Sequence, residues 1–165
     1  SMKLIGAVAI MALAAACSST KSTGPDVAAT DNANSGVSSS VVAGSQDDLE
    51  QNVGHRVFFG YDRFDLSAEA RSVLERQAAW LRQYPNVRIL VAGNCDERGT
   101  REYNLALGAR RAAAARDYLV SLGVAQNRVE TVSYGKERPL DARINEEAWS
   151  VNRNAHTNIV SGAVS

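Results

Sequence analysis

Several features that mark common protein classes are scarce in this 165-residue chain. It has only two cysteines, Cys17 and Cys95, which lie far apart and are best treated as separate residues. A four-ligand metal site would need both of them and both histidines, yet His55 and His156 lack ligand spacing to each other. Lys plus Arg and Asp plus Glu balance at 18 each, so the chain has no general attraction to nucleic acid or anionic lipid. We therefore predict no metal, no cofactor and no nucleic-acid partner.

Long hydrophobic runs are also missing. The apolar stretch 4–16 follows Lys3 and is about a dozen residues long, too short to span a bilayer as a helix. A basic residue before a short apolar run is typical of a secretion signal. The run ends in Ala14-Ala15-Ala16-Cys17, which is similar to a lipoprotein cleavage site, although Ala14 stands where a Leu is usual. We predict a signal peptide at 1–16 and a lipid on Cys17. The alternative is an ordinary signal peptide with an incidental cysteine.

Residues 17–48 are rich in Ser, Ala, Gly, Asn, Asp and Thr and show no apolar period. Such a composition is typical of a flexible tether, and about 30 residues give a random-coil reach of roughly 30 Å. The same composition also fits disordered filler. We predict one folded domain, 49–165, after this segment.

Strand-like and helix-like patterns alternate within 49–165. Branched and aromatic residues predict strands at 56–61, 87–92 and 129–134, and a weaker one at 155–160. Ser67 and Thr100 are suited to cap two amphipathic helices that end near Pro85 and Gly123, and a short helix is expected at 146–151. The order βαβαβ(α)β predicts an α+β fold, an α/β sandwich with helices packed against a mixed sheet.

The most informative stretch is 93–111, GNCDERGTREYNLALGARR. Asp96 leaves the second predicted strand and Arg111 lies three helical turns further on, where a long side chain can lean back toward the loop. An acid beside a guanidinium can hold a ligand that carries both an ammonium and a carboxylate. Gly93 and Gly99 would let the backbone approach such a ligand or turn sharply. The alternative is a structural salt bridge between loop and helix.

This run, followed by Val132-Ser133-Tyr134-Gly135 and by Asn152-Arg153, resembles the OmpA-like peptidoglycan-binding family. The resemblance covers roughly 53–155 and is greatest to the branch of peptidoglycan-associated lipoproteins. It implies an OmpA C-terminal-like fold and no enzymatic activity. It also implies that Asp96 and Arg111 bind the zwitterionic end of meso-diaminopimelate in the peptidoglycan stem peptide.

Five further residues enter the predicted site through the same resemblance. Tyr61 and Asp62 match an aromatic-Asp pair that lines the pocket, but they also suit a core aromatic and a turn. Asn104 could brace the loop, Leu107 could belong to the core, and Arg98 could reach ligand or solvent. The full predicted peptidoglycan-binding set is Tyr61, Asp62, Asp96, Arg98, Asn104, Leu107 and Arg111.

The resemblance also implies partners and a location. Ser18 stands where an Asp after the lipidated cysteine would signal inner-membrane retention, so the expected location is the periplasmic face of the outer membrane. Peptidoglycan, the outer membrane through the lipid anchor and a TolB-like periplasmic protein are the expected partners. The expected role is in the Tol–Pal system, in envelope integrity and cell division.

The chain departs from the family pattern at a few positions. Asn94 replaces a common His, Asn154 replaces a usual second Arg, and His156 and Asn158 dilute the last strand. These changes leave the pairing of that strand and part of a partner surface open. Three other functions also stay open: the peptidoglycan-binding module of another envelope complex such as a flagellar stator, a cell-wall enzyme that uses Cys95, and nucleic-acid binding by the Arg-rich helix.

Overall fold

A computed structural model describes residues 40–164 of the chain. The predicted signal peptide, Cys17 and most of the predicted tether lie outside the described residues. Among residues 40–164, no helix combines the length and the apolar character needed to cross a membrane. The described helical elements, in chain order, are α1 (Gln46–Asp48), the π-helical turn Leu49–Val53, α2 (Ala68–Gln83), α3 (Arg101–Ser121), the 3₁₀ turn Gln126–Arg128 and α4 (Glu146–Asn152). The strands are β1 (Arg56–Phe58), β2 (Arg88–Asn94), β3 (Val129–Gly135) and β4 (Asn154–Ser161).

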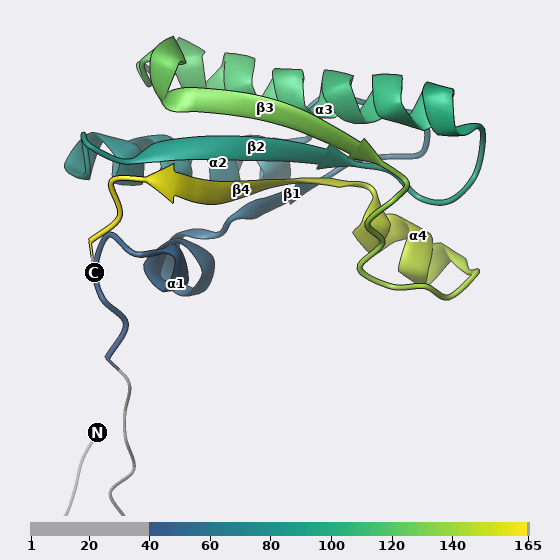
Figure 1. The fold of residues 1–165 in the computed structure, drawn as a ribbon, viewed down its shortest axis with the longest axis horizontal. Coiled ribbons are helices and arrows are strands. Elements are labelled where there is room, and N and C mark those ends of the chain that lie inside the picture. Colours follow the sequence, from purple (N-terminus) through teal and green to yellow (C-terminus); the bar gives the residue numbers. More distant parts are fainter. Residues whose placement is uncertain (1–39, 165) are drawn as a thin grey trace, which may run out of the picture. The chain divides into compact units, whose positions relative to one another are not determined.

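The four strands form one mixed sheet in the order β1-β4-β2-β3 (Figure 1). β2 and β3 run parallel, as expected for strands joined through a helix, while β4 lies antiparallel to both β1 and β2. The helices α2 and α3 pack on one face of the sheet, and α4 lies beyond the end where β2 finishes (Figure 1). This arrangement confirms the predicted α+β sandwich with a mixed sheet.

The core lies between that sheet face and the two long helices. Alternate residues of β2, Ile89 and Val91, are fully buried against the apolar stripe of α3, which includes Ala112 and Leu119. Burying a branched or aliphatic side chain of this size contributes roughly 1.5–3 kcal/mol. The core therefore fixes α3 against β2, and this fixes the positions of the polar residues at the ends of both elements.

Both predicted helix caps are confirmed. The hydroxyl of Ser67 accepts a hydrogen bond from the amide of Ala70, and the hydroxyl of Thr100 accepts one from the amide of Tyr103. Gly123 follows α3 with a positive φ of 98°, which permits the chain to turn away from the helix. The sequence thus predicts where both long helices begin and end.

The strand boundaries differ from the prediction. β1 ends at Phe58 rather than at residue 61, because the chain turns at Gly60 and leaves Tyr61 exposed. The strand expected to be weak, β4, is eight residues long and lies inside the sheet. Thr157 on β4 donates a hydrogen bond to the buried Gln77 of α2, so a polar residue is satisfied there by tertiary structure.

The backbones of β2 and α3 approach closely at two glycines. A Cβ added to Gly93 would lie 1.8 Å from the carbonyl oxygen of Gly108, and one added to Gly108 would lie 2.3 Å from Oγ of Ser133. Glycine is therefore required at both positions. The close approach brings the first turns of α3 against the end of β2, where Asp96 follows.

The described chain begins at the other end of the sheet. Gly44 lies against the ring of Tyr84, which follows α2, and its carbonyl accepts a hydrogen bond from the amide of Val164. Tyr84 leads into the start of β2, whereas α3 and α4 begin near the end of β2 (Figure 1). The segment that enters the domain is thus separated from the start of α3 by the length of the sheet.

Candidate functional site

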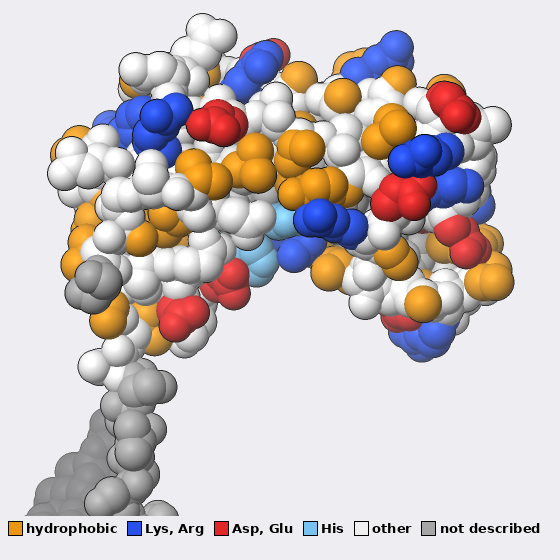
Figure 2. All heavy atoms as spheres, viewed as in Figure 1, with side chains coloured by type: hydrophobic (Ala, Val, Ile, Leu, Met, Phe, Trp, Pro, Cys, Tyr) orange, Lys and Arg blue, Asp and Glu red, His pale blue; other side chains and the backbone are white. Residues whose placement is uncertain are grey.

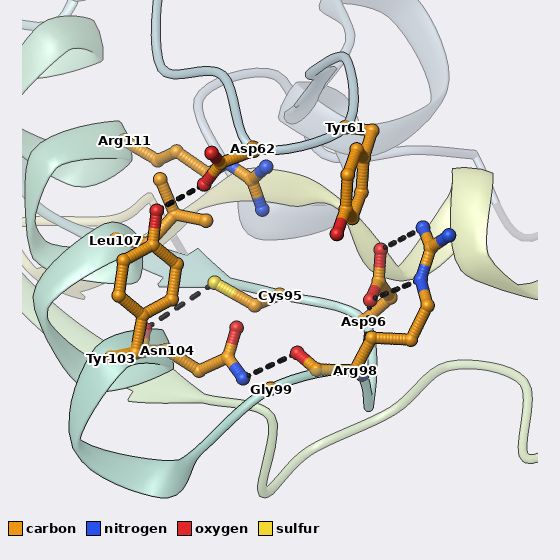
Figure 3. A pocket seen from close by; sticks show the side chains of 10 residues that line it. All are labelled: Tyr61, Asp62, Cys95, Asp96, Arg98, Gly99, Tyr103, Asn104, Leu107 and Arg111. Carbon is orange, nitrogen blue, oxygen red and sulfur yellow. Dashed lines mark hydrogen bonds and ion pairs between the residues drawn. The ribbon is translucent and has the colours of Figure 1, made fainter.

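A small pocket of about 70 Å³ opens where β2 ends and α3 begins. The loop after β1 contributes one wall, the loop after β2 another, and the first three turns of α3 a third (Figure 3). Its lining residues are Tyr61, Asp62, Cys95, Asp96, Arg98, Gly99, Tyr103, Asn104, Leu107 and Arg111. All seven residues of the predicted set therefore lie at one pocket. Their role in binding stays a prediction.

Arg111 is a fully buried cation with no carboxylate within salt-bridge distance among residues 40–164. Its guanidinium donates three hydrogen bonds to backbone carbonyls: Nε to Arg63 (2.8 Å), Nη1 to Asn94 (2.8 Å) and Nη2 to Gly60 (3.1 Å). Burial lowers the pKa of Arg111, although an arginine stays charged at any physiological pH. The pocket thus contains a positive charge that is held by dipoles and not neutralised by an acid.

Asp96 is also buried, with 5% of its surface exposed. Oδ1 accepts from the amide and Nε of Arg98, and Oδ2 accepts from Nη2 of Arg98 (2.8 Å) and Nη1 of Arg153 (3.4 Å). Burial by itself raises the pKa of Asp96, but the hydrogen bonds from Arg98 and Arg153 outweigh it and keep that pKa below its usual value. Asp96 is therefore ionised at neutral pH. The alternative of a structural Asp96–Arg111 salt bridge is wrong for the described residues.

Arg98 is held by two aromatic rings as well as by Asp96. Its guanidinium carbon lies 4.3 Å from the ring centre of Tyr61 and 4.0 Å from that of Trp149 on α4. The indole of Trp149 in turn donates to Oε1 of Glu97 at 3.2 Å. A planar guanidinium between two rings keeps its hydrogen-bonding edge directed at Asp96 (Figure 3).

A hydrogen bond from the hydroxyl of Tyr103 to Oδ1 of Asp62 connects the loop after β1 to α3. Asp62 has a φ of 56°, and it is the non-glycine residue with positive φ in the described chain. This conformation costs energy for most residues, but it turns the carboxylate toward the pocket (Figure 3). The loop also supplies two of the carbonyls that hold Arg111, from Gly60 and Arg63.

Asn104 braces the loop after β2, which was one of its two predicted roles. Its Nδ2 donates to the carbonyls of Arg98 (2.8 Å) and Thr100 (3.0 Å). Leu107 is buried and forms apolar lining of the pocket. Cys95 is buried as well, and burial raises the pKa of its thiol to about 11. A thiol that stays protonated at neutral pH is a poor nucleophile, which argues against an enzyme that uses Cys95.

Sequence reasoning missed two residues at the site. Arg153, 7% exposed, donates to the carbonyl of Phe59 (3.0 Å) and to Glu146 (2.7 Å) in addition to Asp96. The Asn152-Arg153 pair supported the resemblance, but its position 57 residues after Asp96 gave no sign of contact with it. The second is Trp149, whose ring stacks on Arg98.

The pocket contains charges of both signs. Arg111 presents a buried positive charge with the carboxylate of Asp62 near it, and the carboxylate of Asp96 lies across the pocket beside Arg98 (Figure 3). Such a pair of charges in a partly dry pocket is complementary to a small zwitterion. Within the described residues, no group of three or more His, Cys, Asp or Glu side chains is arranged to hold a metal ion.

The fold and the pocket together define a small α+β binding domain with a charged pocket at the carboxyl end of a central strand. The family model described as the OmpA family matches residues 58–153, which include both sides of the pocket. The chain belongs to the OmpA family. This confirms the family suggested by the sequence motif.

Individual relatives agree with this assignment. A peptidoglycan-associated lipoprotein of Rhizobium meliloti is 57% identical over 120 residues, covering 73% of this chain and 68% of its own. One from Mesorhizobium japonicum is 50% identical over 160 residues, covering 97% and 92%. The crystal structure of the peptidoglycan-associated lipoprotein from Burkholderia pseudomallei has a TM-score of 0.62 and 41% identity, covering 64% of this chain and 89% of that one. The names of these relatives describe lipoproteins associated with peptidoglycan, and none of them names an enzymatic activity.

Proposed function

We propose that the chain binds peptidoglycan noncovalently, through the zwitterionic end of meso-diaminopimelate in the stem peptide. The observation that carries the proposal is the presence, in one pocket, of two buried charges: a cation with no carboxylate partner among residues 40–164 and an ionised acid. Arg111 would receive the ligand carboxylate, and Asp96 would receive the ligand ammonium. The relatives are named peptidoglycan-associated lipoproteins, and this supports the same ligand.

Asp96 already accepts hydrogen bonds from Arg98 and Arg153, so a ligand ammonium has to share or replace one of them. Arg98 is the replaceable partner, because 31% of its side chain is exposed against 9% for Arg153. The ligand ammonium would take over the charge-assisted hydrogen bonds that Arg98 gives up, so Asp96 would remain paired. The Tyr61 and Trp149 rings can retain its guanidinium beside the pocket while the ligand binds.

The proposal extends to the envelope. We propose that Cys17 carries a lipid, that the domain lies at the periplasmic face of the outer membrane, and that residues 17–48 tether it there. The names of the relatives as lipoproteins support the lipid, and the small residues before Cys17 support its site. We further propose a TolB-like periplasmic partner and a role in the Tol–Pal system during division, for which the support is the family resemblance alone.

Calorimetric titration of the chain with a diaminopimelate-containing muropeptide tests the ligand. Asp96→Asn and Arg111→Lys should each weaken binding strongly, because loss of one partner of a buried charge pair costs about 2–5 kcal/mol. Arg110→Lys is the matched control, since Arg110 precedes Arg111 but is exposed and stacks on Phe64. Each variant should first be shown to be folded by circular dichroism.

A lysine-type muropeptide serves as the ligand control, because it lacks the second carboxylate beside the distal ammonium. Selective binding that is lost in Asp96→Asn and Arg111→Lys but kept in Arg110→Lys would support the proposal. Equal affinity for the two muropeptides, or no binding by the folded wild type, would refute it. Metabolic labelling with a palmitate analogue, compared between the wild type and Cys17→Ser, tests the lipid separately.

A further inference from the structure

The sheet face opposite α2 and α3 is not covered by any described helix, and it is the face seen in Figure 2. Register places Arg56, His156, Ala92 and Val132 in one row across all four strands. These residues alternate with the core residues of their strands, so they share this open face. In Figure 2 histidine side chains lie next to Lys or Arg side chains near its centre, with hydrophobic side chains beside them.

A layer of cationic and aromatic side chains lies on this face. The guanidinium carbon of Arg138 sits 3.6 Å from the ring centre of Tyr134, whose ring stacks on His156 at 6.4 Å between centroids. On the other side of His156, Nη1 of Arg56 donates to Oδ1 of Asn154 at 2.8 Å. The residues at which the chain departs from the family pattern, Asn154 and His156, are therefore part of this layer and not of the pocket.

The layer carries two arginines without a direct ion-pair partner among residues 40–164, and Glu50 acts on Arg56 only from beyond salt-bridge distance. Neither Arg56 nor Arg138 has a carboxylate within salt-bridge distance among residues 40–164, whereas Glu130 on β3 is already paired with Arg88. Burial, and then the charges of Arg56, His55 and Arg138, lowers the pKa of His156 to about 4, while Glu50 acts in the opposite sense. His156 is thus neutral at pH 7 and lies in a positive potential.

The same face also offers apolar surface and an unsatisfied polar atom. Phe58 of β1 is 48% exposed, and Leu90 and Val132 are half-buried. Beneath them Asn94 is only 3% exposed, and its Oδ1 accepts no hydrogen bond from residues 40–164.

We propose that this open sheet face binds an acidic, partly apolar segment of a protein partner, independently of the pocket. Two unpaired arginines separated by apolar and aromatic side chains match carboxylates that alternate with apolar groups. A nucleic acid or an anionic membrane instead favours a dense basic patch with many phosphate contacts, and the chain has zero net charge. A protein segment is therefore the occupant to which the face is complementary.

The test is an NMR titration of the full chain with a short synthetic peptide in which Glu alternates with Val. The expected result is saturable shift changes at the amides of Val132, Tyr134 and His156. Arg56→Gln combined with Arg138→Gln should weaken binding by about ten-fold, because two exposed ion pairs are lost. Arg138 is exposed and makes no hydrogen bond to other described residues, so replacing it should not disturb folding. Arg138→Gln alone should therefore weaken peptide binding by part of that factor.

Arg71→Gln on the exposed side of α2 is the matched control and should leave binding unchanged. Muropeptide binding should be equal in the wild type and in the double variant, which separates this face from the pocket. Equal binding of a peptide with Lys in place of Glu would overturn the proposal. So would the absence of binding, shift changes confined to other surfaces, or binding of phosphatidylglycerol vesicles or duplex DNA in preference to the acidic peptide.

Discussion

The two sides of the pocket hold their charges in different ways. On the α3 side, Arg111 is fully buried and is held by three backbone carbonyls, so its position depends on the path of the chain. On the opposite side, Asp96 is held by the side chains of Arg98 and Arg153, which can change partner. Under the proposed function, the cation would be fixed in advance of binding, while the acid would exchange one of its partners for the ligand.

Replacing Arg111 by Leu would test the α3 side of the pocket, and it should reduce stability more than any other variant. Three carbonyls would lose their donor, so we expect the free energy of unfolding to fall by about 3 kcal/mol. Urea denaturation measures the change. Arg110→Leu, on the exposed surface, should cost below about 0.5 kcal/mol. Similar small losses in both variants would show that the carbonyl contacts do not stabilise the fold.

Gly93→Ala would disturb the Arg111 side and the Asp96 side of the pocket together. The added Cβ would meet the carbonyl oxygen of Gly108 at 1.8 Å, which forces β2 and α3 apart. Overpacking of this kind costs about 1–3 kcal/mol. Thermal unfolding and muropeptide titration should both show a loss. Gly60→Ala is the control, since its Cβ would meet only the flexible side chain of Arg63.

Arg153→Gln would test the less exposed partner of Asp96. We expect a loss of about 2 kcal/mol in stability, since Asp96 and Glu146 each lose a charged donor. The pKa of Asp96 should rise, and NMR titration of its carboxyl carbon would detect this. Arg153→Lys keeps the positive charge and should therefore lose less stability than Arg153→Gln. An unchanged pKa of Asp96 would mean that Arg153 only supports the packing of α4.

Acid titration should separate the two sides, because only the Asp96 side changes charge. The pKa of Asp96 is below 3.8 in the fold and near 3.8 in the unfolded chain, so ionised Asp96 stabilises the fold above pH 3.8. That contribution is lost as the pH falls through the lower, folded value. The stability difference between the wild type and Asp96→Asn should therefore shrink below pH 3.8. A difference that stays constant with pH would contradict the assignment.

Arg98→Gln should have the smallest effect on stability. The Arg98 side chain is 31% exposed and Gln keeps a neutral donor for Asp96, so the expected loss is about 1 kcal/mol. Muropeptide affinity should change by a larger factor than stability does, and calorimetry with denaturation would compare the two. If Arg98→Gln lost as much stability as Arg153→Gln, Arg98 would not be the more easily replaced partner of Asp96.

The sequence predicted the parts that depend on local chemistry. Ser67 and Thr100 cap their helices as expected, because capping involves neighbours three residues away. β4 was underestimated, since its polar residues are satisfied by distant partners such as Gln77. The partners of Arg111 were not predictable either, because the carbonyls of Gly60 and Arg63 carry no side-chain signature and reach it through the fold. The contact between Arg153 and Asp96 was missed as well, because it also forms only through the fold.

The separation between the chain entry and the pocket has a mechanical consequence. The described chain enters beside Gly44 and Val164, at the opposite end of the sheet from Asp96 (Figure 1). Under the proposed function, a pull between membrane and cell wall would act at these two ends, along the strands. The β1–β4 and β4–β2 hydrogen bonds would then be loaded together in shear and not opened one after another. If residues 17–48 act as the proposed tether, the ladders of the sheet would share the force between them.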